Sequence, residues 1–382
     1  MSQRLKTDWI LFITVLLMVS FGLLTLYSAS SVMAKMDERF HNSWYFVIHQ
    51  VEWALVSIAV MMTLKRTDYR KLNNPSVAFC AMGVTLIMLA AVYVADSGSH
   101  RWLRAGPVGV QPSEIAKPAL VVFLAFFVTW RARAINNRRY TLIPAALSVG
   151  LVILFVVVPD LGTAVVLGIA AGVIFFVAGL EWRYCALVLG IAMIGVLISI
   201  ALKPYRLARV VQFFDPQFRI VARLDPTGRI KSQMQNSLAT RDTNYQLEQS
   251  KIAVGAGGPT GLGLMNGKQK LLYLPAAHTD FIYAVVGEEL GLIGAAGLLL
   301  GFGIIFWRGL RAAWLMHDDF GRYLALGVTI VVVVQGLINM SVVLGMMPTK
   351  GLPLPMVSYG GSSLLSTLAL LGILMNVSEH AG

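Results

Sequence analysis

Ten long apolar runs divide the chain, and each of them is long enough to cross a lipid bilayer. The hydrocarbon core is about 30 Å thick, which takes about 20 helical residues. The runs are continuously apolar and lack the polar–apolar alternation of barrel strands, so they predict helices. They span residues 9 to 29, 44 to 64, 77 to 95, 113 to 130, 142 to 158, 162 to 179, 184 to 202, 281 to 307, 321 to 345 and 357 to 376. The sequence therefore predicts an all-α polytopic membrane protein of about ten transmembrane helices, in a single domain over residues 1–382.

The charges set the expected orientation. Only 13% of the residues are charged, too few to wet the surface of a soluble domain. Lys and Arg gather in alternate short loops, which predicts that both termini are cytoplasmic. The net charge is +12, and we expect the basic residues to lie next to anionic lipid headgroups. A nucleic-acid partner is not needed to explain this charge. The first run is too long for a signal peptide and is expected to stay as an anchor. Cys80 and Cys185 fall inside predicted spans, so no disulfide framework is expected.

Residues 203–280 form a large connection between the seventh and eighth runs, on the predicted outer side. A loop of this length is usually functional or disordered. Within it, "YRLARVVQFF" places apolar residues at helical spacing around Arg206 and Arg209, which predicts a short amphipathic helix at the outer interface. The piece "KIAVGAGGPTGLGLMNGKQK" lacks the phosphate-loop pattern. We expect a close-packed turn over the mouth of the bundle, with Lys268 and Lys270 facing anionic substrate or lipid.

Four ionisable residues lie where charge is expensive. A charge inside a span costs several kcal/mol unless it is paired or faces water. Glu114 and Lys117 stand three residues apart at the outer end of the fourth run, Asp160 stands between the fifth and sixth, and Asp280 precedes the eighth. Each has a local explanation as a salt bridge or a helix cap. Since all four fall at the outer end beneath the same long loop, we predict that they share one polar site.

Further polar residues fall at the same predicted depth. His278 lies two residues before Asp280, and "PTKGLPLPMVSYGGSS" supplies Lys350 and Ser358. Glu288 and Glu289 lie about two turns deeper in the eighth run. For these two glutamates the sequence leaves structural pairing and catalysis equally open.

Five ordered blocks resemble the signature segments of the SEDS (FtsW/RodA) family, the polytopic glycosyltransferases of bacterial cell-wall synthesis. The blocks are "QPSEIAK", "PDLGTA", "QSKIAVGAGGPTGLGL", "PAAHTDFIYAVVGEELG" and "PTKGLPLPMVSYGGSS". The last two are more similar to the cell-division branch than to the elongation branch. The resemblance implies polymerisation of lipid II into glycan strands outside the cytoplasmic membrane, at the septum. It also implies a class B penicillin-binding protein as transpeptidase partner, together with other division proteins.

The resemblance implies a site as well. By match to the family motif, Asp280 would be the essential carboxylate, with Glu114, Lys117 and Asp160 lining the cavity. The reaction joins a sugar hydroxyl to the anomeric carbon of a second sugar while a lipid pyrophosphate leaves, so Asp280 is the expected general base. Basic residues are expected to bind the pyrophosphates: Lys117, Arg206, Arg209, Lys268, Lys270 and Lys350. No metal-ligand spacing is present, which leaves a divalent cation such as Mg²⁺ or Mn²⁺ open.

Three other functions compete with this interpretation. A transporter that moves lipid II across the bilayer would use intramembrane charges equally well. A polymerase of the elongation type would share most of the motifs, and a scaffold for division proteins would use the long loop for docking. Charges at the outer mouth rather than at the midplane favour chemistry there, and a polar path to the cytoplasmic side would favour transport.

Overall fold

A computed structural model describes most of the chain. It covers residues 7–38, 41–96, 98–105, 108–201, 204–215, 243–271, 273–348 and 351–381, together with residues 219, 225 and 232. Lys350, one of the predicted site residues, lies outside the described residues.

Ten helices follow the ten predicted runs, so the all-α fold class is confirmed. They are α1 (Trp9–Met36), α2 (Tyr45–Arg66), α3 (Pro75–Ala95), α4 (Pro112–Trp130), α5 (Ile143–Val157), α6 (Leu161–Val177), α7 (Trp182–Ala201), α12 (Ile282–Leu315), α13 (Asp319–Val343) and α14 (Gly361–His380). By length and composition, nine spans among the described residues are long and apolar enough to cross a membrane, and α6 is shorter at 17 residues.

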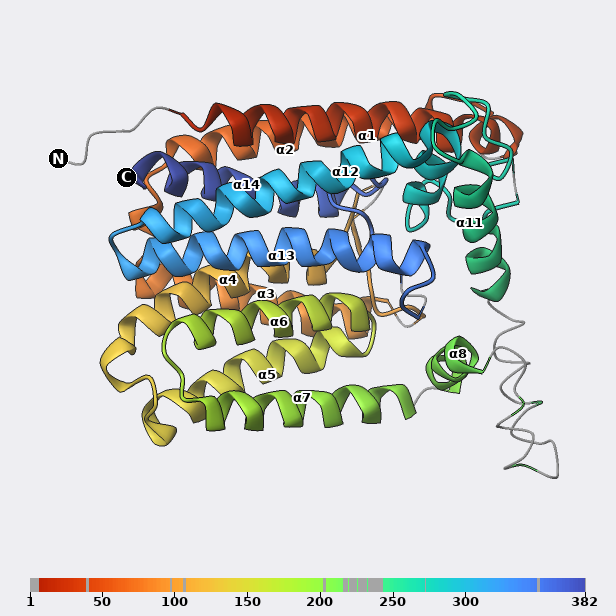
Figure 1. The fold of residues 1–382 in the computed structure, drawn as a ribbon. Coiled ribbons are helices and arrows are strands. Elements are labelled where there is room, and N and C mark those ends of the chain that lie inside the picture. Colours follow the sequence, from red (N-terminus) through yellow and green to blue (C-terminus); the bar gives the residue numbers. More distant parts are fainter. Residues whose placement is uncertain are drawn as a thin grey trace.

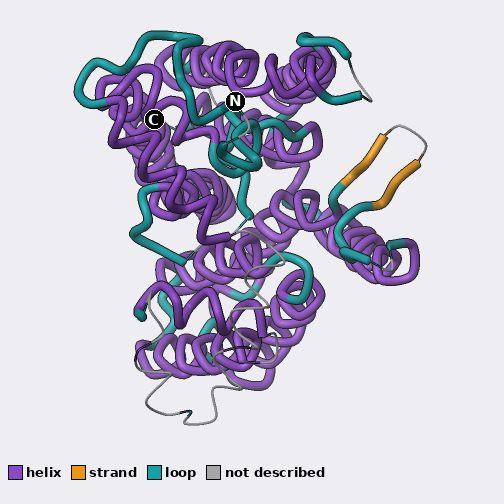
Figure 2. Tube along the Cα trace, turned by 90° about the vertical axis from the view of Figure 1, so that its right-hand side faces the viewer, coloured by secondary structure: helices purple, strands orange, loops and turns teal. Residues whose placement is uncertain are grey.

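Shorter elements connect these helices. They are η1 (Tyr69–Leu72), β1 (Leu103–Ala105), β2 (Val108–Val110), η2 (Ala132–Ala134), η3 (Arg138–Leu142), α8 (Pro204–Phe214) and α11 (Thr243–Gly257). The two strands form an antiparallel hairpin in which Leu103 pairs with Val110, and it projects from the bundle in Figure 2.

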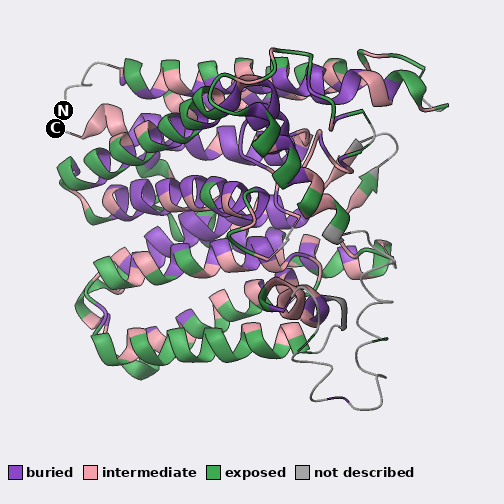
Figure 3. Cartoon of the chain, turned by 45° about the vertical axis from the view of Figure 1, so that its right-hand side comes forward, coloured by how far each residue is buried: buried purple, intermediate pink, exposed green. Residues whose placement is uncertain are grey.

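The long helices run side by side, with the two chain termini at one end and α8 and α11 at the other (Figure 1). We call the end opposite the termini the distal end. We compare how much of the most apolar stretch of each helix is buried. The buried share of that stretch is 78% in α4, 78% in α13 and 72% in α14, whereas no part of it is buried in α7. Figure 3 shows α7 as the exposed edge of the molecule. The centre of the bundle is therefore built by α4, α13 and α14.

Small residues let the central helices approach closely. A Cβ on Gly372 of α14 would lie 2.5 Å from the carbonyl oxygen of Met61 in α2, and one on Gly327 of α13 would lie 2.8 Å from Val121 in α4. Neither position has room for a larger side chain. This is the packing that membrane helices use where apolar burial alone provides no attraction between them.

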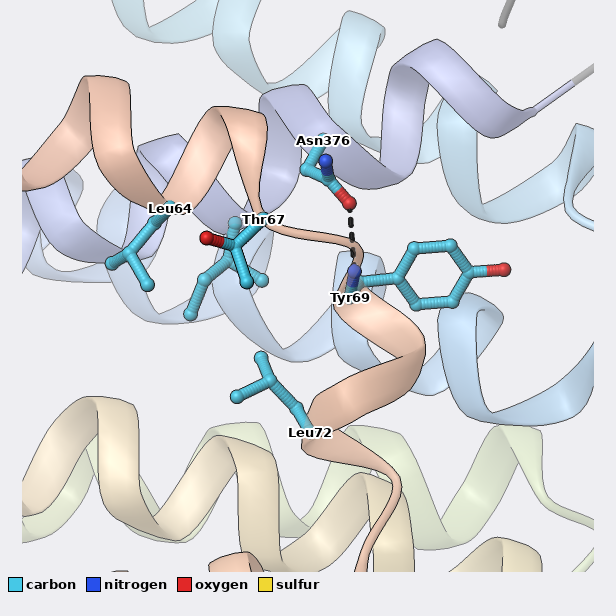
Figure 4. A pocket seen from close by; sticks show the side chains of 6 residues that line it. Leu64, Thr67, Tyr69, Leu72 and Asn376 are labelled. Carbon is cyan, nitrogen blue, oxygen red and sulfur yellow. Dashed lines mark hydrogen bonds between the residues drawn. The ribbon is translucent and has the colours of Figure 1, made fainter.

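Polar contacts close the bundle at the end where the termini lie. Asp8 caps α1 and pairs with Arg308 at 2.7 Å, and Lys65 pairs with Glu379 at 3.3 Å. A small, mostly apolar pocket lies at this end, beside Tyr69 and Asn376 (Figure 4). None of the predicted site residues lines it.

The long connection is partly as predicted. The amphipathic helix is confirmed as α8, whereas the expected turn is wrong for residues 251–257, which form the end of α11. Gly257 faces the α12 backbone so closely that a Cβ there would collide with the carbonyl oxygen of Gly287. Packing against α12 therefore keeps a glycine-rich stretch helical despite its low helix propensity.

Candidate active site

Asp280 ends the loop that leads into α12. The alternative that it caps the helix is wrong, because α12 begins at Ile282 and its N-cap, Phe281, makes no side-chain cap. The Asp280 carboxylate turns toward Gly351 instead, with Oδ2 2.9 Å from the position that a Cβ would take there. Among the described residues it accepts no hydrogen bond, and it is partly exposed. A carboxylate so placed can receive a proton from a bound molecule.

The surroundings of Asp280 adjust its acidity. Burial raises its pKa to about 6, with a further rise from the nearby negative charge of Asp160, while the positive charges of Arg101 and Arg209 oppose the rise. A carboxyl group with this pKa is mostly ionised at neutral pH and is a stronger base than an exposed aspartate. The structure thus brings Asp160 and Arg209 into the electrostatic environment of Asp280.

Asp160 caps α6 and also faces the site. Its carboxylate accepts hydrogen bonds from the Thr163 amide at 3.0 Å, from the Thr163 hydroxyl at 2.8 Å and from Gln111 at 3.4 Å. Arg101 donates from Nε to the carbonyl of Pro159 at 2.7 Å. The cap explanation for Asp160 is therefore correct, and the same turn holds Arg101 near Asp280.

Glu114 and Lys117 form a buried ion pair rather than an interfacial one. Nζ lies 2.7 Å from the Glu114 carboxylate, and each side chain is 1% exposed. Lys117 also donates to Gln335 at 2.6 Å, and Ser366 donates to Glu114 at 3.1 Å. The pair joins α4 to α13 and α14, the three central helices, although only Oε2 of Glu114 is bonded and its buried Oε1 has no hydrogen-bond partner among the described residues.

Two distal segments meet at Asp280. We call residues 278–281 the Asp280 loop and residues 351–360 the strap. The Ser358 hydroxyl donates to the Thr279 carbonyl at 2.5 Å, and the Tyr359 amide donates to the His278 carbonyl at 3.0 Å. The hydroxyl of the predicted residue Ser358 therefore binds the Asp280 loop.

Comparison with known proteins identifies the family. The family model described as cell cycle protein, for FtsW, RodA and SpoVE, matches residues 8–382. The chain belongs to the FtsW/RodA/SpoVE family.

Two curated relatives and two solved structures resemble this family member over nearly its whole length. It is 36% identical to the probable peptidoglycan glycosyltransferase FtsW of Geobacter sulfurreducens over 380 residues, 98% of this chain and 96% of the relative. It is 34% identical to stage V sporulation protein E of Bacillus subtilis, over 100% and 99% of the two chains. A chain from work on the structural coordination of polymerization and crosslinking by a peptidoglycan synthase complex matches at 29% identity and a TM-score of 0.73, over 97% of each chain. RodA of Thermus thermophilus matches at 26% identity and a TM-score of 0.65, over 97% and 96%.

In this FtsW/RodA/SpoVE family member, His278 lies among aromatic rings. Its ring centroid is 4.8 Å from that of Phe46 and 6.0 Å from that of Tyr359. Burial lowers the pKa of His278 to about 4, so the ring is neutral at pH 7. A neutral imidazole can donate or accept a hydrogen bond with a sugar but supplies no positive charge to a pyrophosphate.

Arg206 and Arg209 of α8 have different surroundings. The Arg206 guanidinium is buried and donates to the carbonyls of Val157 at 3.0 Å and Val158 at 2.6 Å, and to the Ser199 hydroxyl at 2.5 Å. It thereby ties α8 to the ends of α5 and α7. Arg209 is less buried and lies within electrostatic range of Asp280.

The predicted orientation of Lys270 is wrong. Its Nζ points into the bundle, 2.5 Å from Glu289 and 2.8 Å from Ser28 of α1, and the residue is 4% exposed. The loop after α11 packs beneath the first turns of α12, which draws Lys270 inward. Lys268 on the same loop is exposed, and its contact with substrate or lipid stays a prediction.

Glu288 and Glu289 hold that loop in place. Glu288 accepts from the main-chain amides of Lys268 at 2.7 Å and Gln269 at 3.1 Å, and Glu289 accepts from Met265 at 3.1 Å. Structural pairing, one of the two alternatives for these glutamates, is thus what the geometry favours. Among the described residues, no group of three or more His, Cys, Asp or Glu side chains could hold a metal ion.

Sequence reasoning missed three residues around Asp280. Arg101 gave a signal, as one of few cations in the predicted outer loops. Gln335 and Asn339 gave none beyond being polar in an apolar run, one helical turn apart. That spacing puts both amides on one face of α13, toward the strap.

Proposed function

We propose that this chain is a peptidoglycan glycosyltransferase that polymerises lipid II into glycan strands, with Asp280 as general base. The observation that carries the proposal is the Asp280 carboxylate at the distal end, which caps no helix and has a raised pKa. The printed name of the Geobacter relative and the synthase complex among the solved structures support the same reaction.

The chemistry follows from the positions of the charges. The 4-hydroxyl of the acceptor sugar attacks the anomeric carbon of the donor, Asp280 accepts the hydroxyl proton, and the lipid pyrophosphate leaves from the opposite face with inversion. Negative charge grows on the pyrophosphate as the bond breaks, and cations stabilise it. Arg101, Arg209 and Lys268 serve this role in our proposal, with Lys350 as a further candidate outside the described residues.

The remaining predicted residues form the substrate-binding surroundings in our proposal. Asp160 and His278 flank Asp280, and the Glu114–Lys117 pair lies on α4 below the strap. Lys117 is bonded to Gln335, whose own amide reaches the strap at the Pro353 carbonyl at 2.9 Å. A displacement of the strap by bound substrate can therefore be transmitted to this buried pair through the Gln335 side chain.

A transporter is the second candidate function, from another class of protein. The composition of the central part of α4 argues against it. From Ala119 to Val128 this helix is buried and apolar without interruption. A transport path along α4 would need polar groups there to replace the water around a sugar headgroup. The charged residues of α4, Glu114 and Lys117, both lie near its distal end.

The proposed setting is the cytoplasmic (inner) membrane, with both termini in the cytoplasm and the distal end outside. The proposed partners are a class B penicillin-binding protein and other division proteins at the septum. Names of relatives in the division branch support this placement, as does the synthase complex among the solved structures.

Purified protein given lipid II, with and without its class B penicillin-binding protein, tests the proposal. We expect glycan polymer from the complex. The competing outcome is that the complex makes no polymer although its transpeptidase is active, and that labelled lipid II moves across the membrane of proteoliposomes. That result would replace the glycosyltransferase with a transporter.

A further inference from the structure

We propose that Asn339 is a positioning residue that fixes Asp280 by tying the Asp280 loop to the strap. The proposal rests on the proposed function, because it assigns a role in the reaction of Asp280. Asn339 lies on α13 and is 2% exposed. It is a buried polar side chain in an apolar run, and such residues are rare unless a specific contact compensates for their burial.

The amide of Asn339 bridges two carbonyl groups. Its Nδ2 donates to the main-chain oxygen of Asp280 at 2.8 Å and to that of Leu352 at 2.7 Å. A primary amide has two N–H donors, and both are used. Two carbonyl oxygens repel one another when brought together, so a donor between them is what allows these two stretches of backbone to meet.

The bridge completes a series of hydrogen bonds along the Asp280 loop. Three consecutive carbonyls are each held by one donor: that of His278 by the Tyr359 amide, that of Thr279 by the Ser358 hydroxyl, and that of Asp280 by Asn339. The Ser358 hydroxyl in turn accepts from the Leu354 amide at 2.8 Å. Because the orientation of a carbonyl sets the backbone dihedrals beside it, these bonds fix the direction in which the Asp280 side chain leaves the chain.

The fit of the carboxylate shows why that direction matters. Asp280 Oδ2 lies 2.9 Å from the position of a Cβ on Gly351, so the carboxylate fits only because the strap has a glycine there. A small rotation of the loop would push it into the strap or away from the site. A misplacement of about 1 Å can cost about a hundred-fold in rate.

Only the donor side of Asn339 is needed for this role. Its Oδ1 is buried and has no hydrogen-bond partner among the described residues. An unpaired buried acceptor is destabilising, so packing alone would favour leucine at this position. The two donor bonds are what the side chain contributes.

Asn376 of α14 offers a matched control. It is 3% exposed and also makes two main-chain hydrogen bonds, donating to the Lys65 carbonyl at 2.6 Å and accepting from the Tyr69 amide at 2.9 Å. Figure 4 shows it beside Tyr69, at the end of the bundle where the termini lie. Asn339→Leu and Asn376→Leu therefore remove the same number of buried hydrogen bonds. The bonds lost in Asn339→Leu lie near Asp280, and those lost in Asn376→Leu lie far from it.

The test measures kcat and KM for lipid II in complex with the penicillin-binding protein, and the thermal midpoint of each variant. We expect Asn339→Leu and Asn339→Asp to lower kcat about a hundred-fold with little change in KM. Asn376→Leu should lose a similar amount of thermal stability and keep its kcat. Equal loss of kcat in Asn339→Leu and Asn376→Leu, or a rise in KM alone, would overturn the positioning role.

Hydrogen exchange separates this proposal from the proposed function. Faster exchange over residues 276–283 in Asn339→Leu, and not in Asn376→Leu, is the expected result, and unchanged exchange there would contradict the bridge. No polymer from the wild-type complex, with an active transpeptidase, would overturn the glycosyltransferase itself. The exchange data would still decide whether Asn339 holds the loop.

Discussion

The carboxylates of this chain divide according to what binds them. Asp8, Asp160, Glu288 and Glu289 each accept hydrogen bonds that hold a helix end or a loop. Among the described residues, nothing of this kind engages the Asp280 carboxylate, although its main chain is firmly held. A rigid backbone with an available carboxylate is what proton transfer to a positioned base requires.

The raised pKa of Asp280 predicts how the rate depends on pH. A base acts when ionised, so kcat/KM should fall about tenfold per pH unit below about pH 6 and level off above about pH 7. The folded pKa lies above the ordinary value, so the folded state holds this proton more tightly and the contribution of Asp280 to folding stability falls as pH rises from about 4 to about 6. Acid thus does not unfold the protein through Asp280. Initial rates between pH 5 and 8 check the prediction, and a flat profile over that range would contradict it.

Lys268 and Lys270 should respond differently to the same substitution. Lys270→Met leaves Glu289 buried without its cation, which should lower the free energy of unfolding by about 3–5 kcal/mol. Lys268→Met changes an exposed side chain and should leave stability nearly unchanged while raising KM for lipid II. Denaturation in detergent and steady-state kinetics measure the two effects. A stable Lys270→Met protein with a raised KM would restore Lys270 to the substrate site.

At the scale of elements, α12 and the end of α11 pack backbone against backbone. Gly291 interrupts α12 with φ at 61°, in the left-handed region that favours glycine. Its neighbours across the contact are main-chain atoms of Gly258, Pro259 and Gly261. The kink therefore makes room for the turn after α11, which carries the loop that Glu288 and Glu289 hold.

Two glycines of α11 test this packing. Gly257→Ala would place a Cβ against the α12 backbone and should destabilise the protein by about 1–3 kcal/mol. Gly255→Ala meets nothing within 4 Å and should stabilise the helix by up to about 1 kcal/mol. Thermal unfolding in detergent compares the two variants. Similar midpoints would mean that α11 does not dock on α12 as described.

The spans were predictable from the sequence because a membrane helix needs a long apolar run, and that signal is local. Glu114, Lys117 and Asp280 could be singled out for the same reason, since each is conspicuous as a charge beside an apolar run, but their separation into a buried ion pair and a carboxylate unbonded among the described residues could not. The burial of Lys270 depends on a partner 242 residues away in α1, and no local pattern reports such a contact. Asn339 is equally invisible, because its role lies in which carbonyls its amide reaches.

For the whole molecule, the two ends of the bundle differ in kind. Ion pairs hold both of them, Asp8–Arg308 at the end with the termini and Lys270–Glu289 toward the distal end. At the distal end the Asp280 carboxylate is partly exposed, and the strap and the Asp280 loop surround it. This asymmetry suits an enzyme that works on one side of the membrane.

Site-directed labelling checks the proposed orientation. In a chain with Cys80 and Cys185 replaced by Ala, Ser99→Cys should react with a membrane-impermeant maleimide in intact cells. His380→Cys should react only after the membrane is opened, because the excess of Lys and Arg in the loops on its side predicts a cytoplasmic location. The reverse pattern would invert the proposed topology.

The most direct test of the central claim is lipid II polymerisation by Asp280→Asn in complex with the penicillin-binding protein. Glu52→Gln, which neutralises an exposed carboxylate of α2, is the control. We predict that Asp280→Asn folds, binds its partner and loses about a hundred- to ten-thousand-fold in rate, while Glu52→Gln keeps the wild-type rate. A folded Asp280→Asn complex that polymerises lipid II at the wild-type rate would contradict the assignment of Asp280 as the base.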